Sequence, residues 1–423
     1  MPVDFSDIKS KLVPISGTLL FMLYAVMLPR YTDTAKTWFV LLILLGLAYM
    51  LTRIKQVKNT ESVERLFFAA IIVNFLWIAF CYYANGQPGR GANLLWSRHF
   101  YLLFVVPLFF LFKKIQISDR VILLTLFASV TVSLTDILID LAQGIDHRLQ
   151  GMNPNGFGPI QLCMSGILLF YCIEKPEKSL RWIALAGALM GLATVVFSKS
   201  RSTWLTLAVL SILFLFYLAR SLPLWKRLGL VGGLLLVLAS SYLLPIVKHR
   251  VHHSLASIDN YLATDDYRDA SRQSSIGVRL ELWKTGWKIF QENPVLGVGV
   301  GGFQVMARAN SERYQVNDVV HHYKYVHNQY LAALATRGLP GLILFLLVML
   351  IPVYIAMSQK AHERDSAVAR LSIIFICLTY LIGSLAEDHF EVKSATMFTG
   401  IMLPLLLARI SNDRLQQNRE SLA

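Results

Sequence analysis

Long apolar runs recur along the whole chain, and they constrain its fold more than any other feature. A helix needs about 20 predominantly apolar residues to cross the hydrocarbon core of a bilayer. Of the 423 residues, 55% are hydrophobic and only 16% are charged. The runs are continuously apolar and lack the alternation of transmembrane barrel strands. The sequence therefore predicts an all-α polytopic membrane protein.

About twelve spans are predicted from these runs. They lie near 13–29, 36–52, 66–84, 96–112, 121–142, 157–173, 182–198, 203–219, 228–247, 338–357, 367–385 and 395–409. Lys and Arg gather in alternate connections, which places those connections and both termini in the cytoplasm. This anchoring explains the net charge of +14, so no nucleic-acid partner is expected.

One connection, at 248–325, is far longer and more polar than the others. It divides the single membrane domain into residues 1–247 with nine spans, a periplasmic loop subdomain at 248–325, and residues 326–423 with three spans and a cytoplasmic tail. Together with His327 the loop holds six of the ten histidines. Histidine titrates near neutral pH, which suggests proton-transfer or anion chemistry on the outer face. The alternative is that polar residues simply concentrate in the longest loop.

Residues 279–290 of this loop predict an amphipathic helix, with Trp283 and Trp287 on one face. Such a helix either lies at the level of the lipid headgroups or packs on a core of the loop's own. The four cysteines lie in or beside apolar runs and outside the loop. We therefore expect small buried hydrophobic side chains and neither a disulfide framework nor a cysteine metal site.

His327 closes the long loop and begins a helical pattern that continues through residue 334. In the first turn of a helix, the dipole would disfavour imidazolium and keep the ring neutral. A neutral imidazole can accept the proton of an attacking hydroxyl. The alternative is an ordinary surface or capping histidine.

Arg201 lies in a short connection between two predicted spans, near the membrane plane. A charge at that depth is costly, and the guanidinium fork suits phosphate oxygens. The alternative is a snorkelling side chain. Residues 153–156 predict a turn with amide groups at the mouth of a span.

The glycine-rich stretch 297–303 lacks the context of a phosphate loop, so close backbone packing or a tight reversal is favoured. Residues 387–389 form an acidic cluster on the outer side, which either orients a histidine, binds sugar hydroxyls or is a solvated loop. Asp265 and Asp266 have no convincing metal-site context, and no metal site is assigned.

As an ordered set, these features resemble the O-antigen ligase/polymerase family of bacterial membrane glycosyltransferases. The matching pieces are Ser200–Arg201, Arg279 followed by Trp283, the glycine run ending in Phe303, His327–Asn328 with Tyr330–Leu331, and Gly338 with Gly341. Their order and spacing match across about 200–345, and 153–155 and the many-span layout also fit. In size and layout, the chain looks most like the O-antigen ligases of lipopolysaccharide assembly.

The resemblance implies a glycosyltransferase-C-like fold and transfer of a glycan from undecaprenyl diphosphate to lipid A–core. The reaction would occur at the periplasmic face of the inner membrane, among membrane lipids, without a metal or another cofactor. Its implied site residues are His327 as base or hydroxyl-orienting group, Asp388 at a late acidic position, Arg201 and Arg279 on the diphosphate, and Asn155, Asn328 and Tyr330 as supporting groups. The family often has an acidic residue where this chain has Thr336. Any role that depends on a carboxylate at that position is therefore not assigned to this chain.

Three other functions remain open. A polymerase of O-antigen or capsule would use the same donor and a second lipid-linked glycan as acceptor. A protein oligosaccharyltransferase of the same family would transfer to a polypeptide, although such relatives tend to be longer. A polysaccharide transporter is less favoured, because the charged groups gather at one face and transport sites lie near mid-membrane.

Overall fold

The computed structural model describes residues 5–52, 60–87, 89–145, 153–174, 177–218, 222–240, 245–358 and 364–420. Every regular element in these ranges is a helix. Nine helical stretches among them are long and apolar enough to cross a membrane: α2 (Thr32–Thr52), α4 (Ser62–Ala84), the run from α5 to α6 (Gly91–Ile115), α7 (Asp119–Ala142), α8 (Pro154–Glu174), α9 (Lys178–Phe197), α15 (Gln329–Met357), Ser366–Gly383 and Lys393–Gln416. The predicted all-α polytopic fold is confirmed.

All nine stretches coincide with predicted spans. Two shorter apolar helices, Leu12–Met27 within α1 (Phe5–Met27) and Arg201–Tyr217 within α10 (Arg201–Leu218), coincide with two more. The predicted span at 228–247 overlaps α11 (Leu224–Ser240) and continues into residues outside the described part of the chain. The total of twelve spans and their orientation therefore stay predictions.

Two helices, α8 and α17 (Lys393–Glu420), form the enclosed centre of the bundle. They pack on each other and are buried along most of their length, with α9 and α16 (Arg364–Gly383) against α8 and α6 (Val105–Ile115) against α17. Small residues allow the close approach: a Cβ added at Gly166 would lie 2.4 Å from the Phe375 ring. Such small-residue contacts are typical of helices that pack within membranes. The cysteines fit the same picture, since three are buried and Cys172 is half-buried.

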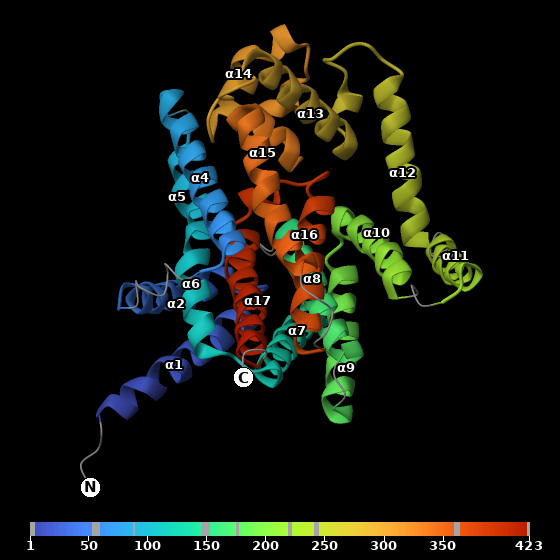
Figure 1. Ribbon diagram of the computed structural model, residues 1–423. Helices are drawn as coiled ribbons and strands as arrows, with labels where there is room; N and C mark the ends of the chain where they lie inside the picture. Colours follow the sequence, from blue (N-terminus) through green and yellow to red (C-terminus); the bar gives the residue numbers. More distant parts are fainter. Residues whose placement is uncertain are drawn as a thin grey trace.

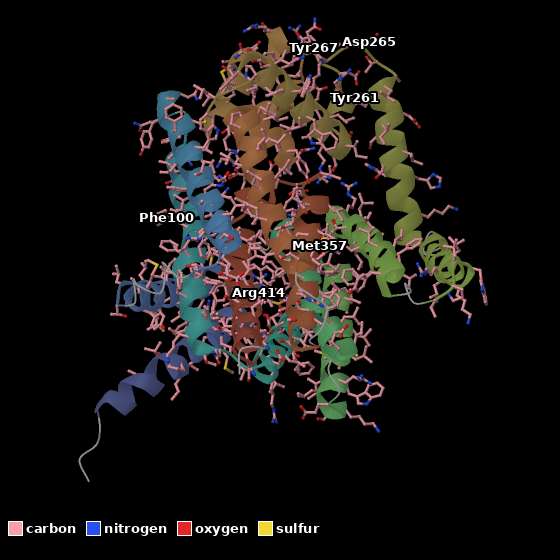
Figure 2. All side chains as sticks on the ribbon, viewed as in Figure 1. Phe100, Tyr261, Asp265, Tyr267, Met357 and Arg414 are labelled. Carbon is pink, nitrogen blue, oxygen red and sulfur yellow. The ribbon has the colours of Figure 1, made fainter. Side chains whose placement is uncertain are left out.

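A helical cap covers one end of the bundle, opposite to both chain termini (Figure 1). It contains α13 (Ser275–Glu292) and α14 (Gly302–Tyr314), while α12 (Pro245–Leu262) stands at the periphery beside α10 and α11. The labelled side chains of Tyr261 and Tyr267 lie at this end, and Arg414 lies away from it (Figure 2). We call this end the loop end.

The cap has an apolar core of its own, which includes Val278, Leu282 and Ile289 of α13 and Phe303 of α14. Of the two alternatives for the amphipathic helix, packing on the loop's own core is therefore confirmed. Trp287 is 46% exposed, so it does not share the half-buried surroundings of Trp283.

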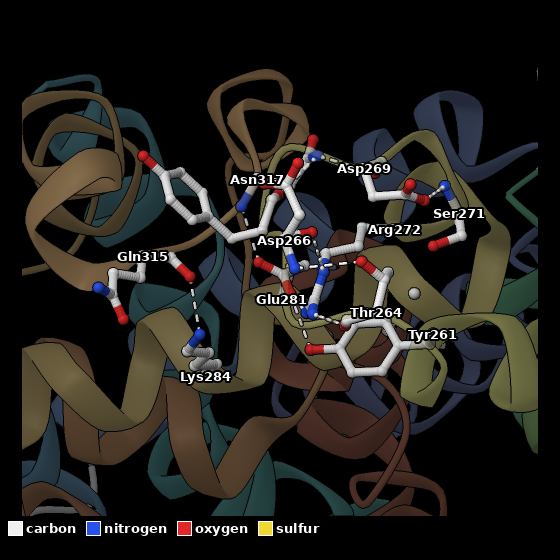
Figure 3. A network of polar contacts seen from close by, with 12 residues as sticks. Tyr261, Thr264, Asp266, Asp269, Ser271, Arg272, Glu281, Lys284, Gln315 and Asn317 are labelled. Carbon is white, nitrogen blue, oxygen red and sulfur yellow. Dashed lines mark hydrogen bonds and ion pairs between the residues drawn. The ribbon is translucent and has the colours of Figure 1, made fainter.

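A buried polar network connects α12, α13 and the segment that follows α14 (Figure 3). Glu281 is fully buried and accepts hydrogen bonds from Arg272 Nη1 at 2.7 Å, the Tyr261 hydroxyl at 2.7 Å and the Asn317 amide at 2.7 Å. The Arg272 guanidinium also lies 4.3 Å from the Tyr261 ring centroid. Buried charges persist where their partners are this complete. The network therefore fixes where α13 sits.

Candidate active site

The beginning of α15 sets the position of His327. Asn328 caps the helix, because its side-chain oxygen accepts hydrogen bonds from the amides of Tyr330 and Leu331. Asn is among the preferred residues at this position. His327 thus precedes the helix, with φ of +55°. The expectation that it lies within the first turn is wrong, because the helix begins at Gln329, after the Asn328 cap.

Asp388 clamps the backbone at this point. Its two carboxylate oxygens accept from the amides of His327 at 2.7 Å and Asn328 at 2.9 Å. The next residue continues the contact, since Gln329 donates its amide to Ser384 O and accepts from the amide of Phe390. Residues 327–329 are therefore held by the connection between α16 and α17. Asp388 thus contacts the backbone at His327, and its side chain lines the cavity that His327 also lines, described below.

Glu387 joins the histidine to an arginine. Its Oε2 is 3.0 Å from His327 Nδ1, and its Oε1 accepts from Arg279 Nη2. The carboxylate is buried, while the side chains of His327 and Arg279 are 27% and 26% exposed. A carboxylate at Nδ1 fixes the proton there and leaves Nε2 as the acceptor in the neutral ring. Nε2 has no hydrogen-bond partner within the described ranges.

The pKa of His327 differs from the expectation based on a helix dipole. Burial lowers it, but the hydrogen bond and charge of Glu387, together with the charge of Asp388, raise it above the ordinary value. The expectation of a lowered pKa is wrong because these two carboxylates outweigh a dipole whose first turn starts beyond the histidine. Burial also raises the pKa of Asp388 to about 7, against the charge of His327.

Arg201 reaches the same region through α13. Its Nη2 donates to Ser275 Oγ at 2.6 Å and its Nη1 to Ser254 Oγ at 3.4 Å. Ser275 and Arg279 are four residues apart on α13 and so lie on one face. The structure therefore brings Arg201 to the α13 face that carries Arg279, with the contact of Arg279 to Glu387 leading on to His327.

A cavity of about 270 Å³, which we call the central cavity, opens at His327, and Arg201 and Arg279 lie outside its lining. Its walls include His327, Glu387, Asp388 and Asn155. Asn155 Oδ1 accepts from Ser200 Oγ at 3.0 Å, next to Arg201 in the chain. The turn predicted at 153–156 is also present, because Asn153 Oδ1 accepts from the amide of Asn155 as α8 begins. Tyr330 points elsewhere: its hydroxyl donates to Leu381 O, which fastens α15 to α16.

The central cavity is also lined by Arg98 and Glu391, charged groups that the sequence analysis did not assign. His99 Nε2 is 3.0 Å from Glu391 Oε1, and both side chains are buried. Burial raises the pKa of Glu391, but the charge and hydrogen bond of His99 outweigh it and hold the pKa at about 2. Arg98 donates to the Tyr325 hydroxyl, and its guanidinium lies 5.2 Å from that ring's centroid.

Arg337 is the largest fully enclosed side chain nearby, and it is 2% exposed. Within the described ranges its Nε and Nη2 have no hydrogen-bond partner. The predicted span began at 338, so the sequence analysis did not place Arg337 inside a membrane helix, whereas α15 includes it. Glu387 was also missed as a site residue; of the three alternatives left open for the cluster at 387–389, its contacts with His327 support the one in which it orients a histidine. The third member, His389, is fully buried beside Tyr380, with ring centroids 5.5 Å apart.

The glycine run packs closely against α15, so of its two favoured roles close backbone packing is confirmed. The amides of Val298 and Gly299 donate to the carbonyls of Ala335 and Thr336, each at 2.9 Å. A Cβ added at Gly297, where φ is +59°, would lie 2.3 Å from the Thr336 carbonyl carbon. Only glycine tolerates both the positive φ and this approach. The run therefore joins the cap to the helix that follows His327.

Comparison with known proteins bears on this geometry. Residues 185–346 match the O-antigen ligase family, so the resemblance is confirmed over the segment that carries Arg201, Arg279 and His327. The match supports a function of the general O-antigen ligase or polymerase type. A protein of Haemophilus influenzae strain Rd, described as an uncharacterized protein, is 22% identical over 388 residues, which cover 90% of this chain and 94% of the relative. The likeness to that relative thus extends over almost the whole chain.

Proposed function

We propose that this multi-pass membrane protein is an O-antigen ligase. It transfers a glycan from undecaprenyl diphosphate to lipid A–core at the periplasmic face of the inner membrane. The observation that carries the proposal is the bond of Glu387 to His327 Nδ1, which leaves Nε2 available at the wall of the central cavity. A base so oriented suits a hydroxyl acceptor.

The proposed step is a direct displacement. The acceptor hydroxyl gives its proton to His327 Nε2 while its oxygen forms a bond to the anomeric carbon of the glycan. The bond from that carbon to the phosphate oxygen breaks, and its electron pair leaves with the diphosphate. Attack from the side opposite the leaving group inverts the anomeric carbon.

Glu387 acts as a positioning residue in this mechanism. It keeps the proton on Nδ1 before the reaction and stabilises the imidazolium after proton transfer, which agrees with the raised pKa of His327. Asp388 holds the two backbone amides that aim the ring. Catalytic geometry depends on such support, because a displacement of about 1 Å can cost about 100-fold in rate.

Arg201 and Arg279 are proposed to bind the leaving diphosphate, whose charge increases as the anomeric bond breaks. One guanidinium group can donate two parallel hydrogen bonds to the oxygens of a phosphate. Preorganised positive charge at a developing anion is usually a large part of enzymatic rate acceleration. These two cations would supply that charge without a metal ion.

A reconstituted assay tests the function. Purified protein receives a glycan on undecaprenyl diphosphate, together with either lipid A–core or a second lipid-linked glycan. We expect transfer to lipid A–core, with release of undecaprenyl diphosphate. Lengthening of the lipid-linked glycan in place of that transfer would identify a polymerase, and movement of the donor across vesicles without a new glycosidic bond would identify a transporter.

A further inference from the structure

A second cavity lies beside the central one, and nothing described above uses it. It has a volume of about 460 Å³ and is lined by residues 29–34, which end the connection from α1 and form the first turn of α2, by Asn153 and Phe157 at the start of α8, and by residues 392–394 at the start of α17. We call it the side pocket. Its volume falls within the range of about 300–1,000 Å³ that is usual for small-molecule sites.

We propose that the side pocket binds an uncharged sugar of the lipid-anchored acceptor and presents its hydroxyl to His327. This inference rests on the proposed transferase function and assigns the acceptor a place within it. The first support is continuity: Asn153, Val392 and Lys393 line both cavities. His327 lines the central cavity, so we infer that a sugar in the side pocket extends along this shared wall towards the base.

The charges of the pocket favour a neutral ligand. Arg30 Nη2 is 2.6 Å from Asp140 Oδ2, and Arg30 Nε is 3.7 Å from Asp136 Oδ2. Lys393 Nζ is 2.6 Å from Asp33 Oδ1. Each of the two cations that line the pocket, Arg30 and Lys393, is therefore paired with a carboxylate, which disfavours the binding of a phosphate. The proposed diphosphate ligands, Arg201 and Arg279, instead gather at α13.

The uncharged groups of the pocket suit a polyol. Thr32, Thr34 and Ser394 provide hydroxyls, and Asn153 provides an amide. Hydroxyls both donate and accept, as sugar hydroxyls do, so they bind them without a net charge. Tyr31, which is 46% exposed, adds aromatic surface that can cover the apolar face of a sugar ring. The mixture of few polar groups on partly apolar walls is typical of a specific small-molecule site.

The kinetic test separates acceptor from donor. Thr34 is exposed at the pocket wall, so Thr34→Trp fills the space without displacing a core, and Asp33→Asn removes a carboxylate that is 97% exposed. We expect each variant to raise the KM for the acceptor at least fivefold and to leave the KM for the donor within twofold. Asp265→Asn, an exposed carboxylate on the cap, is the matched control and should change neither value. An unchanged acceptor KM, or an equal rise of the donor KM, would overturn the inference.

A labelling test does not depend on turnover. Thr34→Cys offers an accessible thiol, and the wild-type protein, with three buried cysteines and one half-buried, reports the background. Lipid A–core and a second lipid-linked glycan are added separately as the acceptor probes. Slower maleimide labelling with either probe, and not with free undecaprenyl diphosphate, supports the pocket and identifies its source of sugar. If neither probe changes the labelling rate, the proposed sugar site is refuted. If a probe slows labelling but the wild-type protein transfers no glycan, the proposed reaction is refuted and the sugar site is retained.

Discussion

Glu387 Oε2 lies 3.0 Å from His327 Nδ1, although the two residues are 60 positions apart in the chain. The same carboxylate binds Arg279 through its other oxygen. One buried group therefore links the proposed base to a proposed diphosphate ligand. This relationship makes the site testable, since the charge, the base and the arginine can each be changed alone.

Removing the base tests its role directly. The φ of +55° at His327 makes Asn the suitable replacement, because Asn tolerates left-handed backbone far better than most residues. We expect His327→Asn to insert and fold normally and to lower kcat by about 100-fold or more, the usual contribution of general base catalysis. His321→Asn, in the cap, is the control for loss of an imidazole. Transfer near the wild-type rate in His327→Asn would exclude a catalytic role.

The pH dependence follows from the raised pKa of His327. Only the neutral ring accepts a proton, so kcat/KM should rise with pH through a midpoint above the ordinary histidine value of about 6.5. Glu387→Gln removes the charge that raises this pKa, and the midpoint should move to lower pH. A profile of kcat/KM from about pH 5 to about pH 9 measures both midpoints. Coincident midpoints would contradict the role of Glu387.

The proposed diphosphate ligands predict a difference between Arg and Lys. Arg201→Lys and Arg279→Lys keep the charge and lose the fork, so transfer should fall by about tenfold or more, which corresponds to about 1.4 kcal/mol of transition-state binding. Arg268→Lys, whose parent side chain is 67% exposed, controls for the substitution itself. If both site variants transfer the glycan at the rate of this control, the proposed bidentate binding of the diphosphate by guanidinium groups is wrong.

Charge supplied by two arginines also predicts insensitivity to chelators. We expect transfer by metal-stripped protein in EDTA to equal the untreated rate, because no proposed step uses a divalent cation. Recovery of a lost rate on adding magnesium, manganese or calcium back would contradict this assignment.

The buried network of the cap predicts a large loss of stability. Glu281→Gln leaves the Arg272 charge without its buried partner, and such losses cost about 3–5 kcal/mol. The matched control is Glu312→Gln, which breaks the exposed pair with Arg268 and should cost less than about 1 kcal/mol. Thermal unfolding and proteolysis of the 263–270 connection compare the two. Equal melting temperatures would show that the network does not hold the cap.

Much of the fold follows from local sequence properties. An apolar run of sufficient length predicts its own helix in lipid, where backbone groups must be paired within the segment. Residues 66–84 and 121–142 needed no information about their neighbours to be predicted as spans. The role of the glycine run could likewise be predicted, because glycine is favoured where φ is positive or backbones approach closely. Three of its glycines have positive φ, and one of these contacts the α15 backbone.

The site was only partly predictable, because its contacts join distant segments. His327 and Arg201 carried local signals, a histidine at a helix start and an arginine at the membrane plane. Nothing local indicated that Glu387 would meet His327 or that His99 would meet Glu391, 292 positions away. The pKa of His327 was predicted in the wrong direction for the same reason, since its two carboxylates arrive from the connection between α16 and α17.

The clamp by Asp388 has a consequence for biogenesis. A chain synthesised from its N-terminus at about 5–20 residues per second exposes the loop that ends at His327 several seconds before residues 387–391 emerge. Until that connection arrives, the histidine lacks both its ring partner and its backbone clamp. Under the proposed mechanism, we therefore expect the nascent protein to be inactive until this connection has been synthesised. Truncation after α16 removes Glu387 and Asp388 and should yield an inserted but inactive polypeptide, so synthesis of the connection between α16 and α17 is expected to complete the site.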